Sequence, residues 1–222
     1  SIAVGDLVFG AVGPRTGVWT EPTVLERGLY ECADMETMVR TVEALYGPYR
    51  WGRYDVLILP PSFPFGGMEN PRLTFLTPTF LAGDRSLVSL IAHELAHSWS
   101  GNLVTNAVWA DSWLNEGFTS YIEGRVTEAL YGEERANMAR VLDWAGIQEA
   151  IATIPANSQR LHLIGDRGAD DSNSAIVYDK GALFLRTIER IMGRTRFDAY
   201  LRSYFDRHAF QPMTTEIFLA DF

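Results

Sequence analysis

Cysteine is almost missing from this sequence, because Cys32 is the only one among 222 residues. No intrachain disulfide can form and nothing indicates an oxidising compartment, so we expect a cytoplasmic location. Long apolar runs are missing as well. No stretch reaches the roughly 18 apolar residues that a membrane-spanning helix needs, so we expect no membrane partner.

Basic side chains are in the minority. Lysine and arginine total 19 against 28 aspartates and glutamates, which gives a net charge of −9. This balance argues against a nucleic-acid partner, which would favour basic patches. Apolar residues make up 47% of the chain, enough for a packed core, which argues against disorder. The opening SIAVGDLVFGAVG has neither the charged start of a signal peptide nor an initiator methionine, so we expect the chain to be cut from something longer.

The expected elements follow the order of an α+β protein with one domain, residues 1–222. Residues 2–20 read as extended segments, with breaks at Gly5, Gly10 and Gly13-Pro14. Residues 33–48, ADMETMVRTVEALYGP, have the apolar spacing of a helix. The short apolar runs YDVLILP and LTFLTPTFL read as strands, the first of them buried. From Asp84 the pattern is mostly helical, apart from a loop at residues 155–175 that is rich in Asn, Asp, Ser and Gly.

Histidine is scarce and unevenly placed, since two of the four histidines fall in the stretch HELAHSWSGN. His93 and His97 are four residues apart, so on a helix they share one face and both imidazoles reach one metal ion. Glu94 is offset around the helix, where it reaches a water on the metal as a general base without being a ligand. This H-E-x-x-H pattern is typical of metal-activated hydrolysis. The alternative is a chance match on an ordinary helix.

Two helices are expected around this motif. The one that carries the histidines should begin with an N-cap at Asp84 and stop at Gly101-Asn102. A second helix should begin with a cap at Asp111 and end near Gly132. Its core-facing residues are expected to be Trp113, Leu114, Tyr121 and Ile122.

A third ligand is needed, because a catalytic zinc takes three protein ligands and keeps one position open for water. Glu116 follows His97 with 18 residues between them, in the apolar context WLNEGF, and completes a set of two histidines and one glutamate. A lone glutamate on a helix is usually solvated, which is the alternative here. Glu123 is a candidate to accept a hydrogen bond from a ligand histidine, although a surface ion pair fits it equally well. Asn115 is a second candidate for such a supporting contact.

Two motifs together resemble one family. GGMEN at residues 66–70 and HELAH followed by Glu116 in WLNEGF match the gluzincin zinc aminopeptidases, which include alanyl aminopeptidases and leukotriene hydrolase. The segments LPPSFPFGGMENPRLTFLTPTFLAGDRSL and GNLVTN are most similar to the leukotriene hydrolase branch. The resemblance implies a thermolysin-like catalytic domain, with a small mixed sheet followed by a mainly helical lobe. It also implies a zinc-dependent aminopeptidase with one zinc ion per chain, acting on peptides with a free N-terminal amine.

The resemblance extends to single residues. Tyr178, in IVYDKGALFL, matches the tyrosine that stabilises the oxyanion in this family, and Glu69 matches the glutamate that binds the free α-amino group. Without the resemblance, Tyr178 would read as a core or surface residue and Glu69 as an exposed turn residue. The segment expected to lie along the substrate consists of Pro64, Phe65, Gly66, Gly67, Met68, Glu69 and Asn70. Family members also carry an all-β domain before and a helical domain after this one, so we expect an isolated catalytic domain whose partners include those flanking domains.

Two other functions stay open. Epoxide hydrolysis on a lipid is the second activity of the leukotriene hydrolase branch, and Asp170 occupies the place of an acidic residue implicated in it. A tyrosine of that branch is replaced here by Asn173. The arginine that would hold the lipid carboxylate belongs to a C-terminal domain that we expect to lie outside these 222 residues, which disfavours this activity. The other alternative is a catalytically dead scaffold that binds peptides, although every required residue type is present.

Overall fold

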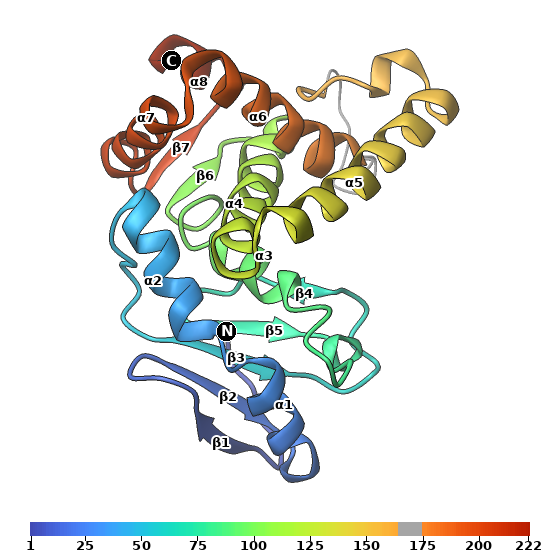
Figure 1. Cartoon of the computed structure of the whole chain (residues 1–222). Helices are drawn as coiled ribbons and strands as arrows, with labels where there is room; N and C mark the ends of the chain where they lie inside the picture. The colour runs from blue at the N-terminus through green and yellow to red at the C-terminus, as the bar shows by residue number, and fades with distance from the viewer. Residues whose placement is uncertain (164–174) are drawn as a thin grey trace.

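The computed structural model describes residues 1–163 and 175–222, which form a sheet layer followed by a helical lobe (Figure 1). Five strands in this part of the chain make one sheet in the order β1-β2-β3-β5-β4. They are β1 (Val8–Ala11), β2 (Thr16–Thr20), β3 (Tyr54–Ile58), β4 (Gly67–Met68) and β5 (Leu73–Leu76). β2, β3 and β5 run parallel, while β1 and β4 pair antiparallel at the two edges. β3 is buried along its whole length, as a central parallel strand covered on both faces should be.

Two helices connect β2 to β3. They are α1 (Leu25–Glu31) and α2 (Met35–Tyr46), and α2 confirms the helix predicted over residues 33–48. Its inward face carries the predicted apolar residues, of which Met35, Met38, Val39 and Val42 are buried. The helix stops at Gly47, whose φ of 100° favours a residue without a side chain.

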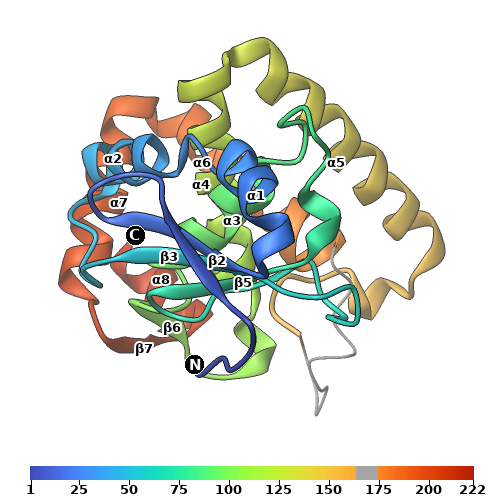
Figure 2. The same cartoon turned by 90° about the horizontal axis from the view of Figure 1, so that it is seen from below.

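The helical lobe is centred on α4, which packs against α3, α5 and α6 (Figures 1 and 2). The helices of the lobe are α3 (Ser89–Ala96), α4 (Trp113–Tyr131), α5 (Glu133–Thr153), α6 (Gly181–Met192), α7 (Arg194–Arg207) and α8 (Thr215–Asp221), with a π-helical turn η6 (Ala175–Lys180) before α6. Two short strands, β6 (Val104–Asn106) and β7 (Gln211–Met213), pair in parallel and join the segment after α3 to the C-terminal helices. The four residues of α4 predicted to face the core are all buried.

Short 3₁₀ turns fill several connections. They are η1 (Pro22–Val24), η2 (Pro78–Phe80), η3 (Trp109–Asp111) and η4 (Ala156–Ser158). The first and second follow directly on strands β2 and β5. The run LTFLTPTFL is therefore extended only over residues 73–76 before the chain turns, because the proline removes a backbone donor that a longer strand would need. Gly10, predicted as a break, lies inside β1.

Both predicted N-caps are wrong. The histidine helix begins at Ser89, after Gly83 and Arg85 turn the chain with φ angles of 90° and 59°. Asp84 accepts a hydrogen bond from the Ser86 amide within that turn, so its carboxylate does not reach the helix. The helix also ends earlier than predicted, at Ala96, with His97 as the C-cap.

The second wrong cap is Asp111. α4 begins at Trp113 with Ser112 as its N-cap residue. Asp111 lies in η3, and its buried carboxylate accepts hydrogen bonds from the side chains of His162 and Thr215. A carboxylate that is already paired with two distant side chains is not free to cap the helix that follows it.

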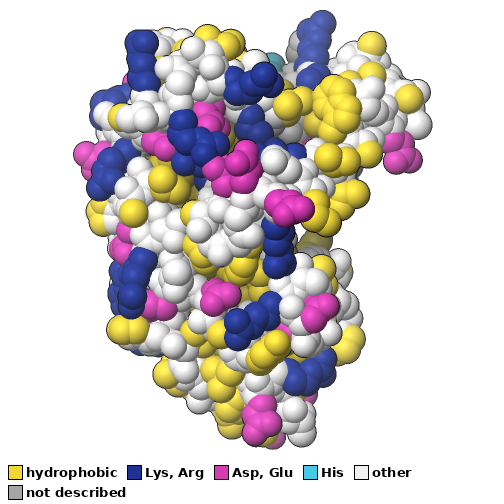
Figure 3. All heavy atoms as spheres, in the orientation of Figure 1, with side chains coloured by type: hydrophobic (Ala, Val, Ile, Leu, Met, Phe, Trp, Pro, Cys, Tyr) yellow, Lys and Arg dark blue, Asp and Glu magenta, His cyan; other side chains and the backbone are white. Residues whose placement is uncertain are grey.

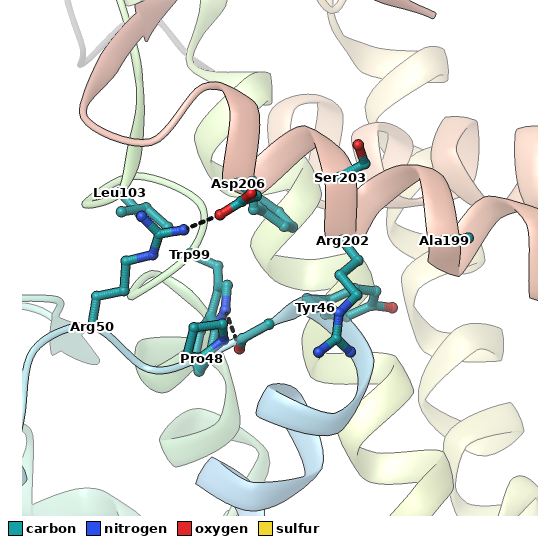
Figure 4. A pocket seen from close by; sticks show the side chains of 11 residues that line it. Tyr46, Pro48, Arg50, Trp99, Leu103, Ala199, Arg202, Ser203 and Asp206 are labelled. Atoms are coloured by element: carbon teal, nitrogen blue, oxygen red, sulfur yellow. Dashed lines mark hydrogen bonds and ion pairs between the residues drawn. The ribbon is translucent and has the colours of Figure 1, made fainter.

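A hollow of about 430 Å³ lies between the end of α2 and α7 (Figure 4). Its floor contains the buried rings of Tyr46 and Trp99. The Trp99 indole N–H donates to the carbonyl of Gly47, and Arg50 pairs with Asp206 of α7 across the opening. These two contacts tie the segment after α2 to the helical lobe, and the residues that line this hollow do not line the cleft described below.

The surface is mixed in charge. On the face shown in Figure 3, basic and acidic side chains alternate, and apolar side chains gather over α5. The large exposed apolar residues of that helix are Met138, Val141, Leu142, Trp144 and Ile151. Within residues 1–163 and 175–222, no helix has the length and apolar character to cross a membrane.

Candidate metal centre and active site

The two histidines of the HELAH motif lie at the end of α3, and Glu116 lies in the first turn of α4. The rings of His93 and His97 are 4.9 Å apart and nearly perpendicular, at 81°. Each Nε2 atom is 3.4 Å from Glu116 Oε2. The structure therefore brings the three predicted ligands together, with one donor atom of each within 4.8 Å of the others.

Each imidazole is held through its other ring nitrogen. His93 Nδ1 is 3.1 Å from Glu123 Oε2, and His97 Nδ1 is 2.8 Å from Asn115 Oδ1. These oxygens accept, so both Nδ1 atoms carry the proton and the Nε2 lone pairs face Glu116. Glu123 and Asn115 thus lie where the sequence predicts supporting contacts.

Ser100 joins the ends of the two helices, a role that the sequence does not indicate. Its hydroxyl donates to the carbonyls of Leu114 and Asn115 at 2.8 and 3.1 Å. Its own carbonyl is 3.1 Å from His97 Nδ1, and the Thr119 hydroxyl is also 3.1 Å from that nitrogen. The turn after α3 and the start of α4 are therefore fixed to each other around one imidazole.

The donor set fits a zinc ion. Glu116 Oε2 is buried and has no hydrogen-bond partner among the described residues, although two imidazole lone pairs face it. Burying an unpaired carboxylate oxygen against other lone pairs is costly unless a cation lies between them. Two imidazoles and one carboxylate are also a set that catalytic zinc sites use, with a fourth position left for water.

Tyr178 reaches this cluster because two glycines touch. A Cβ added to Gly117 would lie 2.9 Å from the Cα of Gly181, so α4 and α6 approach more closely than residues with side chains would allow. The π-helical turn before α6 then places the Tyr178 ring 5.8 Å from that of His93, nearly parallel at 15°. An isolated glycine inside a helical pattern was the only sequence signal for this contact.

Glu94 lies directly against the sheet. Its Oε1 would be 2.2 Å from a Cβ added to Gly67, so the backbone of β4 rests on this carboxylate. Its Oε2 is buried and has no hydrogen-bond partner among the residues that the structure describes. Gly67, the second glycine of the GGMEN motif, therefore leaves room for the side chain of the predicted general base.

Burial and charge tune the two predicted catalytic groups. Burial raises the pKa of Glu94 to about 8, opposed by His93 and assisted by the nearby carboxylate of Glu69. A carboxyl group with a pKa near neutrality exchanges a proton readily under working conditions. Burial, together with the charge of Glu116, also raises the pKa of Tyr178, so its phenol stays protonated and able to donate.

A cleft of about 930 Å³ runs over the cluster. Of the segment predicted to lie along the substrate, residues 64–69 line the cleft and Asn70 does not. The Asn70 amide donates to the Met68 carbonyl and closes a turn. Asn102, which the sequence does not indicate, donates through its side chain to the Glu69 carbonyl at 2.7 Å. Carboxylate oxygens of Glu69 and Glu94 lie within 4.8 Å of each other.

Asp170 and Asn173, which bear on epoxide hydrolysis, lie outside the described residues, so that part of the prediction stays untested. The remaining predicted site residues all fall within the described part of the chain, in or directly beside β4, α3, α4 and η6. Segments that are far apart in the sequence thus converge on one cleft.

A family model for the peptidase family M1 domain matches residues 31–222. This chain belongs to peptidase family M1. Leukotriene A-4 hydrolase of Xenopus laevis is 48% identical over 220 residues, which cover 97% of this chain and 36% of that protein. Aminopeptidase B of Rattus norvegicus is 44% identical over 230 residues, which cover 99% of this chain and 35% of that protein. The M1 domain described here thus spans about a third of the length of these relatives.

Solved structures show the same fold. Yeast LTA4 hydrolase in complex with bestatin matches with a TM-score of 0.93 and 41% identity, over 98% of this chain and 36% of that one. A mutant M1 zinc metallopeptidase from Deinococcus radiodurans, bound to a Tyr-ser-ala substrate, matches with a TM-score of 0.73 and 26% identity, over 97% of this chain and 47% of that one. The predicted α+β fold and the predicted resemblance to zinc aminopeptidases and leukotriene hydrolase are therefore confirmed.

Proposed function

We propose that this M1 domain is the catalytic domain of a zinc-dependent aminopeptidase, which removes the N-terminal residue of peptides that have a free amine. One observation carries the proposal. The carboxylates of Glu69 and Glu94 lie in the same cleft as the cluster of His93, His97 and Glu116. A cluster suited to zinc, a general base and an anionic site for an ammonium group are what an exopeptidase of this kind needs. The relatives named aminopeptidase support the same conclusion.

We propose one zinc ion per chain, held by His93, His97 and Glu116. When bound in such a site, zinc lowers the pKa of its water to about 7 and polarises the scissile carbonyl. The hydrogen bonds of Glu123 and Asn115 to the two imidazoles would keep their Nε2 lone pairs pointed at the ion. Supporting contacts of this type hold the ligand geometry in zinc sites.

The chain's own side chains account for the proton transfers. Glu94 accepts a proton from the attacking water and passes it to the leaving amine, as a general acid–base group does. Tyr178 donates a hydrogen bond to the oxygen on which negative charge develops. Glu69 pairs with the α-ammonium group and sets which peptide bond lies over the cluster.

Domain organisation, location and the alternative functions are part of the proposal in less detail. We take residues 1–222 as one catalytic domain, and the greater length of the relatives supports the expectation that other domains flank it in a longer protein. A cytoplasmic location stays a prediction. No described residue favours epoxide hydrolysis or a dead scaffold over peptide hydrolysis, so we propose neither.

The test combines metal analysis with turnover. The purified protein should contain about one zinc per molecule and hydrolyse aminoacyl anilides with a free amine. Glu94→Gln should keep the zinc and the fold, because Glu94 is not a ligand, yet lose about 10²–10⁴-fold in kcat, as expected for a general base. Absence of zinc after zinc-supplemented purification would overturn the metal assignment. Full kcat in the glutamine variant would overturn the role of Glu94.

A further inference from the structure

Asp111 is a buried carboxylate with an unusual set of partners. It is 1% exposed, and its Oδ1 accepts hydrogen bonds from His162 Nδ1 at 2.7 Å and from the Thr215 hydroxyl at 2.5 Å. The Thr215 hydroxyl in turn accepts from the Trp113 indole N–H at 2.9 Å. A buried carboxylate is costly unless it is paired and hydrogen-bonded, so this arrangement holds its three segments in one geometry.

Those three segments come from distant parts of the chain. Asp111 ends η3 just before α4, His162 follows α5 and η4 in the chain, and Thr215 begins α8. A backbone bond reinforces the contact, because the Leu163 amide donates to the Ala110 carbonyl at 2.9 Å. We call Asp111, His162 and Thr215 the η3 clip.

The η3 clip lies next to the cleft without being part of its chemistry. Trp109, the first residue of η3, lines the cleft and is 62% exposed. The metal cluster has support of its own, because the Ser100 hydroxyl donates to the backbone carbonyls of Leu114 and Asn115. Loss of the clip should therefore move Trp109 and leave the cluster in place.

We propose that the η3 clip is a positioning device that holds the Trp109 indole as an apolar wall for a peptide side chain. The proposal rests on the aminopeptidase function proposed above and adds a selectivity element to it. An indole fixed at a cleft wall gains from burying a large apolar side chain of the substrate and gains little from a small one. Asp111, His162 and Thr215 would act on selectivity only through Trp109.

The test compares a large and a small substrate, phenylalanyl anilide and alanyl anilide. His162→Leu removes the donor to Asp111, and Thr215→Val removes the second donor. In both variants kcat/KM for the large substrate should fall about tenfold, mainly through KM, within the roughly 10²-fold that a misplacement of about 1 Å can cost. The small substrate and the zinc content should change by less than about twofold. His162→Asn, whose amide can still donate to Asp111, should restore the selectivity.

Two controls make the result specific. His208→Leu breaks another histidine–aspartate pair, the one with Asp221, whose residues do not line the cleft, and should leave selectivity unchanged. Trp109→Ala should cause the same loss for the large substrate, and His162→Leu should add nothing in that background, because residues that act through one contact are not additive.

A second readout does not depend on turnover. The emission of Trp109, taken as the difference between each protein and its Trp109→Phe counterpart, should be quenched more strongly by acrylamide in His162→Leu than in the parent or in His208→Leu. Equal quenching with unchanged selectivity would overturn the clip. If the parent hydrolyses neither substrate, the proposed function fails, and the quenching experiment alone decides whether the clip holds Trp109.

Discussion

The two walls of the cleft are built differently. The helical wall, from α3, α4 and η6, carries His93, His97 and Glu116, and the side chain of His97 is only 2% exposed. Each imidazole there has its own hydrogen-bond partner. The sheet wall consists of residues 64–69, where Phe65 is 57% exposed and β4 pairs with β5 over only two residues.

This difference separates two tasks. Metal ligands must keep a fixed geometry, which burial and multiple hydrogen bonds provide. A wall that receives different peptides gains from backbone and half-exposed side chains that adjust. The walls meet where Gly67 rests on Glu94, so the proposed general base is held by the helix and covered by the sheet. Four experiments, given in order of decreasing effect, test this contrast.

The largest effect is expected on the helical wall. His97→Ala should abolish zinc binding and all turnover, since a buried two-ligand remainder does not make a catalytic zinc site. Asn115→Ala should keep a site of weaker affinity, by about 10–100-fold, as is usual when a supporting hydrogen bond to a ligand is lost. Elemental analysis and a competitive chelator titration measure both. A stoichiometric zinc content in His97→Ala would contradict the assignment of the cluster.

On the sheet wall, Glu69→Gln should lower kcat/KM for substrates with a free N-terminal amine and spare substrates whose amine is acetylated. Losing one partner of a buried charge pair costs roughly 3–5 kcal/mol, or on the order of 10²–10³-fold in kcat/KM. A substrate with an acetylated N-terminus lacks that charge, so the same variant should cost it little. Measuring kcat/KM for both substrates on both proteins isolates the pairing. Equal losses would show that Glu69 acts structurally.

The contact between the walls is tested by Gly67→Ala. Its Cβ would lie 2.2 Å from Glu94 Oε1, so the strand or the carboxylate must shift, and kcat should fall on the order of tenfold. Gly66→Ala is the matched control, because its Cβ would meet nothing nearer than Leu90 Cδ1 at 3.7 Å. We expect the control to keep its kcat and both variants to keep zinc. Similar kcat values for the two variants would argue against the close contact.

The smallest effect lies away from the cleft, in the sheet layer. Hydrogen bonds from Arg15 hold the pKa of Glu43 below its usual value of 4.5. A lowered pKa contributes stability above pH 4.5 that is lost as the pH falls through the folded-state value. Arg15→Met should thus melt lower than the parent at pH 7, and the difference in melting temperature should narrow once the pH falls below 4.5. Arg40→Met, which removes a 3.7 Å pair between the exposed Arg40 side chain and Glu36, should show a smaller gap in melting temperature at every pH.

The sequence by itself determined the order of strands and helices and the candidate metal ligands. The spacing of His93 and His97 fixes them on one helical face, and the apolar spacing of residues 33–48 fixes a helix, because both patterns depend only on neighbours a turn apart. The resemblance then supplied Glu69 and Tyr178, whose own surroundings in the sequence say little.

Only the tertiary structure decided how these residues meet. The partners of Asp111 are 51 and 104 residues away, and Gly67 and Glu94 touch across two different elements. Gly117 of α4 and Gly181 of α6 likewise touch across two different helices. No local pattern encodes such contacts, because they follow from how whole helices and strands pack and from which buried polar groups must find a partner. That is why Asp111 was predicted as a helix cap from its neighbours and is found pairing with two distant side chains instead.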